Sequence, residues 1–563
     1  MFDHFARKLV GGRGTGPVVT GGGYHWHLSP AAVALFPAGP DPDGWHRAGA
    51  AVVVKQNLQR TISRAAILAG NDAIKLCHVF VKVCRANTPR AVAREWLRPA
   101  KARLEYENLA ELRRRGVGSV EPLAWGSRSR HWPGDSVLIT REQPGVRPLH
   151  EVLAETTAPA ERRALAGRFG AYLARLHAAG VRHPDPHPGN VLVTPAGEFL
   201  LMDVHAVRFA PGPLAWPAAR DDLVLWNRWF QPRATTADRG RFWRAYTAAG
   251  RASPVRQRAE EVEELTRRSN RRFWTARLAR YTSDNRDTQR IGRGRLAGFA
   301  VRDWLPADLE QWLTDPDAAF AAHGVVLWKD SASATVAPVV VRLTRGDVPA
   351  VAKRFKVKSA GRAAKNAVRP SPARRSWVLG HNLLDRGLPT PRPLLLLERH
   401  RFGLPHTGTV VFERVADSLE LPGALAAVAD RPDRRRVVRA WAEALGRLLR
   451  AMHDAEVAHR DLKAANVLMQ GAAVDPAAAV PVLIDLVGVT VGRPVPDAVR
   501  VRDLARLAAS FLASPAVTNG DRLTLLRAYL GPRGPAWKHW WLWVAGAVRA
   551  KAAKNARSGR PLA

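Results

Sequence analysis

An internal repeat constrains this chain more than any other feature, because a repeated pattern requires a fold that can be built twice. RLHAAGVRHPDPHPGNVLV at 175–193 matches RAMHDAEVAHRDLKAANVLM at 450–469. The shared positions keep one constant offset, and they pair His177 with His453, His183 with His459, Asp185 with Asp461, and Asn190 with Asn466. Three further blocks match at similar offsets, around Lys82 and Lys353, Gly116 and Gly387, and Asp203 and Asp485. The sequence therefore predicts two copies of one domain.

Within each copy, short strands are expected first and helices afterwards, with the polar residues in loops. Val437, Trp441, Leu445, Leu448 and Met452 recur at spacings of three and four, which predicts one buried face of a long helix. Strands followed by helices indicate an α+β domain.

A hairpin is predicted at NVLVTPAGEFLLMDV, with its turn at Pro195–Ala196–Gly197. Such a hairpin would bring Asp185, Asn190 and Asp203 towards one place.

The second copy carries HRDLKAANVL at 459–468, followed by IDLVG, a pair typical of the catalytic and metal loops of protein kinases. Asp461 would accept the hydrogen bond of an attacking hydroxyl group. Asn466 and Asp485 would coordinate magnesium, and Lys463 would offset charge on the transferred phosphoryl group. Lys353, at the end of a strand, would hold the α- and β-phosphates of ATP. Phosphoryl transfer depends mainly on positioning and electrostatics, which these groups provide.

In the first copy the corresponding lysine, catalytic-loop aspartate, asparagine and metal-loop aspartate are Lys82, Asp185, Asn190 and Asp203. Glu105 is placed to pair with Lys82, and Glu107 is the competing assignment. The loop has the form DxHxGN, which is similar to that of small-molecule and lipid-directed kinase relatives.

Three departures from the protein-kinase pattern affect the interpretation. Neither copy has a GxGxxG segment before its lysine, and the second copy has Ser331, Ser333 and Thr335 there instead. Alignment of the two copies places Ser376 where the first has Glu105, so Lys353 lacks an evident glutamate partner. No APE-type segment follows either metal-loop aspartate, which argues against a peptide-docking platform.

These motifs, with VAKRF, LLDRGLPTPRPLLLLE and RVRDLARL, resemble the lipopolysaccharide kinase (Kdo/heptose kinase) family of the protein-kinase-like superfamily. The resemblance implies an α+β fold with two tandem bilobal protein-kinase-like domains, using ATP and Mg²⁺. The expected organisation is an N-terminal extension (1–49), a divergent first domain (50–290), a linker (291–320) and a second domain (321–563). The implied reaction is phosphorylation of a sugar hydroxyl in the inner core of lipopolysaccharide.

The formal net charge of +38 would attract an anionic glycolipid, although composition bias also explains it. No motif supports nucleic acid as a partner. There is no run of about 18 apolar residues and only two cysteines occur, Cys77 and Cys84, so we expect a cytoplasmic chain. The tail WKHWWLWVAGAVRAKAAKNARSGR has two interpretations, a helix on the surface of the inner membrane or a terminal helix packed through its tryptophans.

Two alternatives to glycolipid phosphorylation remain open at this level. The HRDLK form also fits a kinase acting on Ser or Thr in proteins. The missing glycine loop and Ser376 also fit a pair of pseudokinases that form a scaffold.

Overall fold

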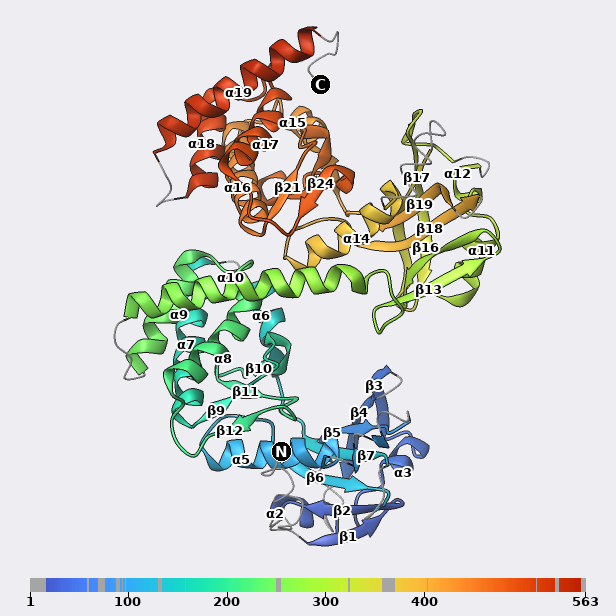
Figure 1. The fold of residues 1–563 in the computed structure, drawn as a ribbon. Helices are drawn as coiled ribbons and strands as arrows, with labels where there is room; N and C mark the ends of the chain where they lie inside the picture. The colour runs from blue at the N-terminus through green and yellow to red at the C-terminus, as the bar shows by residue number, and fades with distance from the viewer. Residues whose placement is uncertain are drawn as a thin grey trace. The chain divides into compact units, whose positions relative to one another are not determined.

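The computed structural model describes residues 17–57, 60–68, 76–87, 92–93, 95–96, 98–129, 134–156, 158–249, 255–321, 325–356, 370–401, 404–512, 514–531 and 536–557. The chain forms two compact units, Met1–Ser269 and Asn270–Ala563. Each unit has a seven-stranded antiparallel sheet and a mainly helical part with two small sheets (Figure 1). The predicted α+β fold is therefore confirmed, and it occurs twice.

The large sheet of unit one has the strand order β1-β2-β6-β7-β5-β4-β3. Its strands are β1 (Val18–Gly21), β2 (Tyr24–Leu28), β3 (Ala51–Asn57), β4 (Arg60–Leu68), β5 (Leu76–Cys84), β6 (Pro122–Ser127) and β7 (Ser136–Arg141). Two short helices, α2 (Pro30–Val33) and α3 (Pro42–Arg47), connect β2 to β3. Helix α5 (Lys101–Arg114) packs on the sheet through Ala102, Glu105, Leu109 and Leu112, which are spaced as one helical face.

The helical part of unit one follows in the chain. Its helices are α6 (Leu149–Glu155), α7 (Pro159–Ala178), α8 (Trp216–Phe230), α9 (Thr236–Ala249) and the first turns of α10 (Val255–Arg280). The small sheets pair β8 (Arg147–Pro148), β10 (Val191–Val193) and β11 (Phe199–Leu201), and β9 (Val181–Arg182) with β12 (Arg208–Phe209). β10 and β11 form the predicted hairpin before Asp203, with Val193 opposite Phe199.

The large sheet of unit two has the order β13-β14-β18-β19-β17-β16-β15. Its strands are β13 (Thr288–Arg293), β14 (Leu296–Val301), β15 (Lys329–Asp330), β16 (Ala334–Leu343), β17 (Gly346–Phe355), β18 (Pro393–Arg401) and β19 (Leu404–Glu413). Helix α14 (Pro372–Asp385) packs on this sheet, and α11 (Pro306–Thr314) and α12 (Ala318–Ala321) precede β15.

The helical part of unit two repeats the plan of unit one. Its helices are α15 (Leu421–Ala427), α16 (Arg434–Asp454), α17 (Asp497–Ala509), α18 (Asn519–Leu530) and α19 (Trp537–Arg557). The small sheets pair β20 (Ser418–Glu420), β22 (Val467–Gln470) and β23 (Val480–Leu483), and β21 (Val457–His459) with β24 (Val489–Val491).

The two large sheets have the same strand order once each strand is matched to its counterpart. The strands that these sheets include place the domain boundaries differently from the sequence prediction. The hairpin β1–β2 lies in the segment predicted as an extension, yet β2 pairs with β6. The hairpin β13–β14 begins just before the predicted linker, and β14, inside it, pairs with β18. The repeat was recognised through its polar loop residues, and these hairpins carry none of them.

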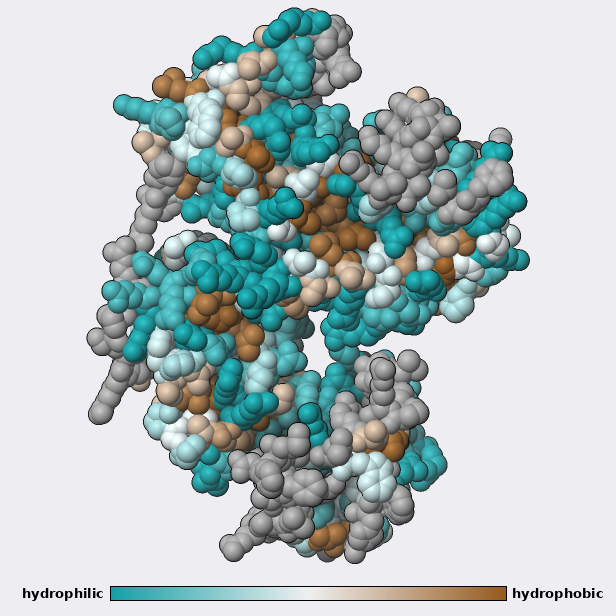
Figure 2. All heavy atoms as spheres, in the orientation of Figure 1, coloured by the Kyte–Doolittle hydropathy of each residue, from teal (hydrophilic) through white to brown (hydrophobic). Residues whose placement is uncertain are grey.

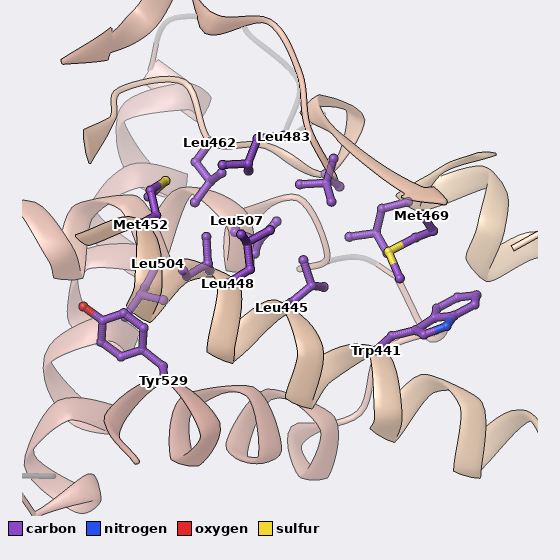
Figure 3. Close-up of a cluster of buried hydrophobic side chains, with 14 of the residues drawn as sticks. Trp441, Leu445, Leu448, Met452, Leu462, Met469, Leu483, Leu504, Leu507 and Tyr529 are labelled. Atoms are coloured by element: carbon purple, nitrogen blue, oxygen red, sulfur yellow. The ribbon is translucent and has the colours of Figure 1, made fainter. Parts of the chain in front are cut away.

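The helix predicted from the spacing of Val437, Trp441, Leu445, Leu448 and Met452 is α16, and all five side chains are buried. They form the helical core of unit two with Leu462, Met469, Leu483, Leu504, Leu507 and Tyr529, among others (Figure 3). Unit one has an equivalent core around Phe169 and Leu173 of α7. Each core lies directly beneath the loops that carry the predicted site.

The visible face of the molecule is mostly hydrophilic, with smaller hydrophobic patches (Figure 2). Within the described part of the chain, no helix has both the length and the apolar character needed to cross a bilayer. The tail helix α19 packs against α17 and α18, with Trp540 and Val548 buried and Leu542 and Trp543 exposed. This favours the packed interpretation of the tail.

Candidate active sites

In unit two, strand β17 and the loop after β23 bring Lys353 and Asp485 together. Lys353 Nζ lies 2.8 Å from Asp485 Oδ1. Burial by itself would raise the pKa of Asp485, but the charge and hydrogen bond of Lys353 outweigh it and lower the pKa below its ordinary value. Asp485 is therefore a carboxylate at neutral pH, the form required to bind a cation.

The catalytic loop of unit two lies beside Asp485. The Asn466 amide Nδ2 donates to the Asp461 carbonyl oxygen at 2.7 Å, which fixes the loop between them. The backbone N–H of Ile484 donates to the Asn466 carbonyl oxygen at 3.0 Å, so Asn466 and Asp485 are held close together. The Asp461 side chain is 55% exposed and its Oδ1 lies 3.5 Å from Arg506 Nη1. Asp461 can thus be reached by a substrate from solvent.

A buried network below the loop orients it. Asp503 Oδ2 accepts the backbone N–H of His459 at 2.8 Å, and the His459 Nδ1 accepts the backbone N–H of Asp461 at 3.3 Å. Burial lowers the pKa of His459, which keeps its ring neutral. His459 therefore supports the loop as a neutral ring. His453 Nδ1 adds a 2.8 Å hydrogen bond to the Tyr529 hydroxyl.

The neighbourhood of Lys353 has no glutamate in the position that Glu105 has in unit one. Ser376 of α14 is buried, and its hydroxyl donates to the Pro372 carbonyl of its own helix at 2.8 Å. In the β15–β16 hairpin, Thr335 is buried and donates to Asp330, while Ser333 is exposed. Ser333 and the half-buried Ser331 are the hydroxyl groups of that hairpin left near the surface.

In unit one, Lys82 of β5 is at the centre of a denser ionic cluster. Its Nζ lies 2.6 Å from Glu105 of α5 and 2.9 Å from Asp203. Glu107, the competing partner, instead accepts a hydrogen bond from Arg103 at 2.7 Å. Burial by itself would lower the pKa of Lys82, but the two carboxylates raise it above its ordinary value. The lysine therefore stays charged although it is buried.

The metal-loop carboxylate of unit one has two further side-chain partners, Arg60 and His205. Arg60 Nη1 lies 3.2 Å from Asp203 Oδ2, and His205 Nδ1 lies 3.1 Å from Asp203 Oδ1. Burial would raise the pKa of Asp203, but the hydrogen bond from His205 and the charge of Lys82 lower it strongly. Both oxygens of this carboxylate are engaged, whereas Asp485 in unit two is paired with Lys353 alone among the described residues.

The catalytic loop of unit one keeps the backbone links of unit two. The N–H of Met202 donates to the Asn190 carbonyl oxygen at 2.9 Å, which places Asn190 beside Asp203. Asp185 is exposed and makes no side-chain hydrogen bond or ion pair with another described residue. Asp222 supports the loop by accepting the backbone N–H of His183 at 2.7 Å.

Both metal-loop aspartates have a left-handed backbone, with φ of 55° at Asp203 and 58° at Asp485. A non-glycine residue adopts this conformation at a cost of about 1 kcal/mol or more, and such strain concentrates at functional sites. The same strained conformation at the equivalent position of both units indicates that the fold directs these two carboxylates towards their lysines.

The residues of unit two fit a magnesium ion, which prefers oxygen ligands. Asp485 Oδ2 and the Asn466 amide oxygen accept no hydrogen bond from the described residues. In unit one, Glu105, Asp203 and His205 have ligand atoms within 4.8 Å of one another, but Glu105 is paired with Lys82. Asp203 and Asn190 therefore form the better oxygen pair there.

Sequence reasoning missed several contributors, among them Arg60, His205 and two tyrosines. Arg60 and His205 were not singled out, and no spacing in the sequence indicated that they meet at Asp203. Tyr246 and Tyr529 were also missed, although each forms a hydrogen bond with a histidine that the repeat aligned. A search for further residues at a similar offset would have found the tyrosines.

Each unit has a seven-stranded sheet that carries a lysine, followed by a helical part with a catalytic loop and a metal-loop aspartate. This combination defines a protein-kinase-like domain, and the chain contains two. The lipopolysaccharide kinase (Kdo/WaaP) family model matches residues 46–246 and 361–529. The chain belongs to that family.

Individual relatives match shorter segments. The serine/threonine-protein kinase PknA of Mycobacterium tuberculosis is 33% identical over 103 residues, which are 18% of this chain and 23% of PknA. The 3-deoxy-D-manno-octulosonic acid kinase of Haemophilus influenzae is 30% identical over 91 residues, 16% of this chain and 35% of that enzyme. The chain therefore spans only a part of the length of these relatives. A solved structure titled "WaaP in complex with acyl carrier protein" is similar over 47% of this chain and 99% of that chain, with 23% identity and a TM-score of 0.34.

Proposed function

We propose that this chain is a kinase that transfers the γ-phosphoryl group of ATP to a hydroxyl of an anionic glycolipid sugar, and that unit two catalyses the transfer. The observation that carries the proposal is the arrangement of Lys353, Asp461, Asn466 and Asp485 around one site. Family membership and the HRDLK loop support it.

Each residue has a defined part in the proposed reaction. Lys353 holds the α- and β-phosphates, and Asp485 and Asn466 provide oxygen ligands for Mg²⁺, which supplies charge neutralisation when bound. Asp461 accepts the proton of the acceptor hydroxyl. At the same time the hydroxyl oxygen forms a bond to the γ-phosphorus, and the bond between that phosphorus and ADP breaks. Lys463, half-buried two residues along, offsets charge on the transferred group.

The acceptor class is inferred from the segment after the metal loop and from charge. The chain between Asp485 and α17 consists of a short turn, the three-residue strand β24 and a brief connection. This is too short for the activation segment on which protein kinases dock peptides. The formal charge of +38 suits a phosphorylated or carboxylated glycolipid at the inner membrane surface.

Unit one supports a second role. Its nucleotide-site residues are assembled, yet Asp203 is engaged by the side chains of Lys82, Arg60 and His205. We propose that unit one binds nucleotide and contributes less to turnover than unit two.

The test compares ADP formation by the wild-type chain, Asp461→Asn and Asp185→Asn, with Mg²⁺, ATP and either a lipopolysaccharide fraction or a peptide library. Asp461→Asn should lower turnover by about 100-fold or more, since general-base groups contribute on that scale. Asp185→Asn is the matched control and should lower it far less. Its exposed aspartate makes no side-chain hydrogen bond or ion pair with another described residue, so the fold should be intact, as a melting curve would verify.

Three outcomes would change the proposal. Wild-type activity in Asp461→Asn would refute the site, and loss in Asp185→Asn alone would move catalysis to unit one. Preferential labelling of peptides would replace the glycolipid with a protein substrate.

A further inference from the structure

Arg60 opens strand β4 of unit one, next to the hairpin connection that covers phosphates in kinase folds. In the register of β4 with β5, Arg60 is opposite Cys84 and Ile62 is opposite Lys82. Residues opposite each other, and residues two apart on one strand, share a face of the sheet. Arg60 and Lys82 therefore lie on the same face, two positions apart.

The guanidinium group of Arg60 is held inside the site. Its Nη1 lies 3.2 Å from Asp203 Oδ2, and the side chain is only 23% exposed. Lys82 and His205 contact the other oxygen, Oδ1, at 2.9 Å and 3.1 Å. Arg60 thus occupies the one oxygen of Asp203 that Lys82 and His205 leave open.

Unit two shows that the fold does not require this arginine. There Val336 is opposite Lys353, and Ala334 is opposite Phe355, so Ala334 holds the register position of Arg60. Asp485, the counterpart of Asp203, has Lys353 as its cationic partner among the described residues. An arginine at this position is therefore a specific property of unit one.

We infer that Arg60 is a phosphate-binding residue of unit one, which pairs with Asp203 in the free protein and moves to the β- or γ-phosphate of a bound nucleotide. This rests on the proposed nucleotide site of unit one. The sequence NLQR at 57–60 contains no glycine, unlike the glycine-rich loop of protein kinases. A guanidinium group supplies paired N–H donors that match phosphate geometry. Its transfer to phosphate frees Asp203 Oδ2 for a cation.

The experiment measures equilibrium binding of MgADP and of adenosine by calorimetry, using the full chain with Lys353→Ala to silence unit two. Arg60→Ala in that background should weaken MgADP binding by about tenfold or more and leave adenosine binding unchanged, because only the phosphates are contacted. Arg60→Lys should recover part of the loss. Arg64→Ala is the matched control: Arg64 lies on the same strand and face, but it pairs with Glu142 at 2.8 Å.

Each other outcome contradicts the inference in a different way. An unchanged MgADP affinity in Arg60→Ala would show that the arginine does not bind phosphate. An equal loss of affinity for adenosine and MgADP would show that Arg60 has only a structural role. No MgADP binding in the Lys353→Ala background, together with binding by the wild-type chain, would overturn the inference for unit one and leave the proposed activity of unit two standing.

Discussion

The two units have the same sheet topology and the same support beneath the catalytic loop, but they differ in the charges around the lysine. In unit one, Lys82 has a buried glutamate partner, and Asp203 is paired with both Lys82 and Arg60. In unit two, Lys353 pairs with Asp485 alone among the described residues, and the catalytic loop carries the complete HRDLK sequence. The comparison teaches that the scaffold of this fold and its catalytic groups vary independently of each other.

The shared support should be equally indispensable in both units, and this gives the largest expected effect. Asp503 and Asp222 are fully buried, and each accepts the backbone N–H of a loop histidine. Asp503→Ala and Asp222→Ala would each leave that donor buried without a partner and should lower the free energy of unfolding of their unit by about 3 kcal/mol. Hydrogen exchange followed by mass spectrometry reports each unit separately.

In that measurement, peptides of α16 should lose protection in Asp503→Ala, and peptides of α7 in Asp222→Ala. Normal protection in either variant would mean that the common network supports only one of the two loops. The similarity between the units would then be one of sequence alone.

Substitution of the residues beside the two lysines should distinguish the units, with an effect of intermediate size. Glu105→Gln leaves buried Lys82 with Asp203 as its remaining carboxylate, so protection of α5 should fall by about 2 kcal/mol. Ser376→Ala is the matched change in unit two. It removes a hydroxyl whose one hydrogen bond to a described residue lies within its own helix, so the protection of α14 against hydrogen exchange should change by less than about 1 kcal/mol. Equal effects would contradict the difference between the two lysine environments.

The sequence predicted the duplicated fold and the long helix α16 because repetition and helical periodicity are local signals. It also predicted the β10–β11 hairpin, which brings Asn190 beside Asp203, as its counterpart in unit two brings Asn466 beside Asp485. It did not predict the hairpins β1–β2 and β13–β14, whose residues have no distinctive pattern. Nor did it predict Arg60 at Asp203, because that contact joins residues 143 positions apart through the sheet geometry.

A half-buried histidine should make unit two sensitive to acid, with the smallest of these effects. The ring of His381, on α14, stacks on Tyr281 with 4.7 Å between the centroids and meets Trp377 at 4.5 Å in an edge-to-face contact. Burial, with the nearby charges of Arg392 and Arg277, lowers the pKa of His381 to about 3. Its folded-state pKa is thus below the unfolded value of 6.5, so the unfolded state takes up the proton first.

The stabilisation from neutral His381 is therefore complete above about pH 6.5 and decreases as the pH falls towards 3. Between pH 7.5 and 5.5 His381 should lower the free energy of unfolding of unit two by about 1 kcal/mol. Urea unfolding or hydrogen exchange of α14 peptides would measure this decrease. His381→Phe keeps a ring against Tyr281 and Trp377 but cannot take up a proton, so it should remove this part of the pH dependence. Helix α5, the counterpart of α14 in unit one, contains no histidine, so its peptides should lack this contribution and serve as an internal control. An unchanged slope in His381→Phe would assign the acid sensitivity of unit two to two fully buried histidines, His453 and His459, whose pKa values burial also lowers.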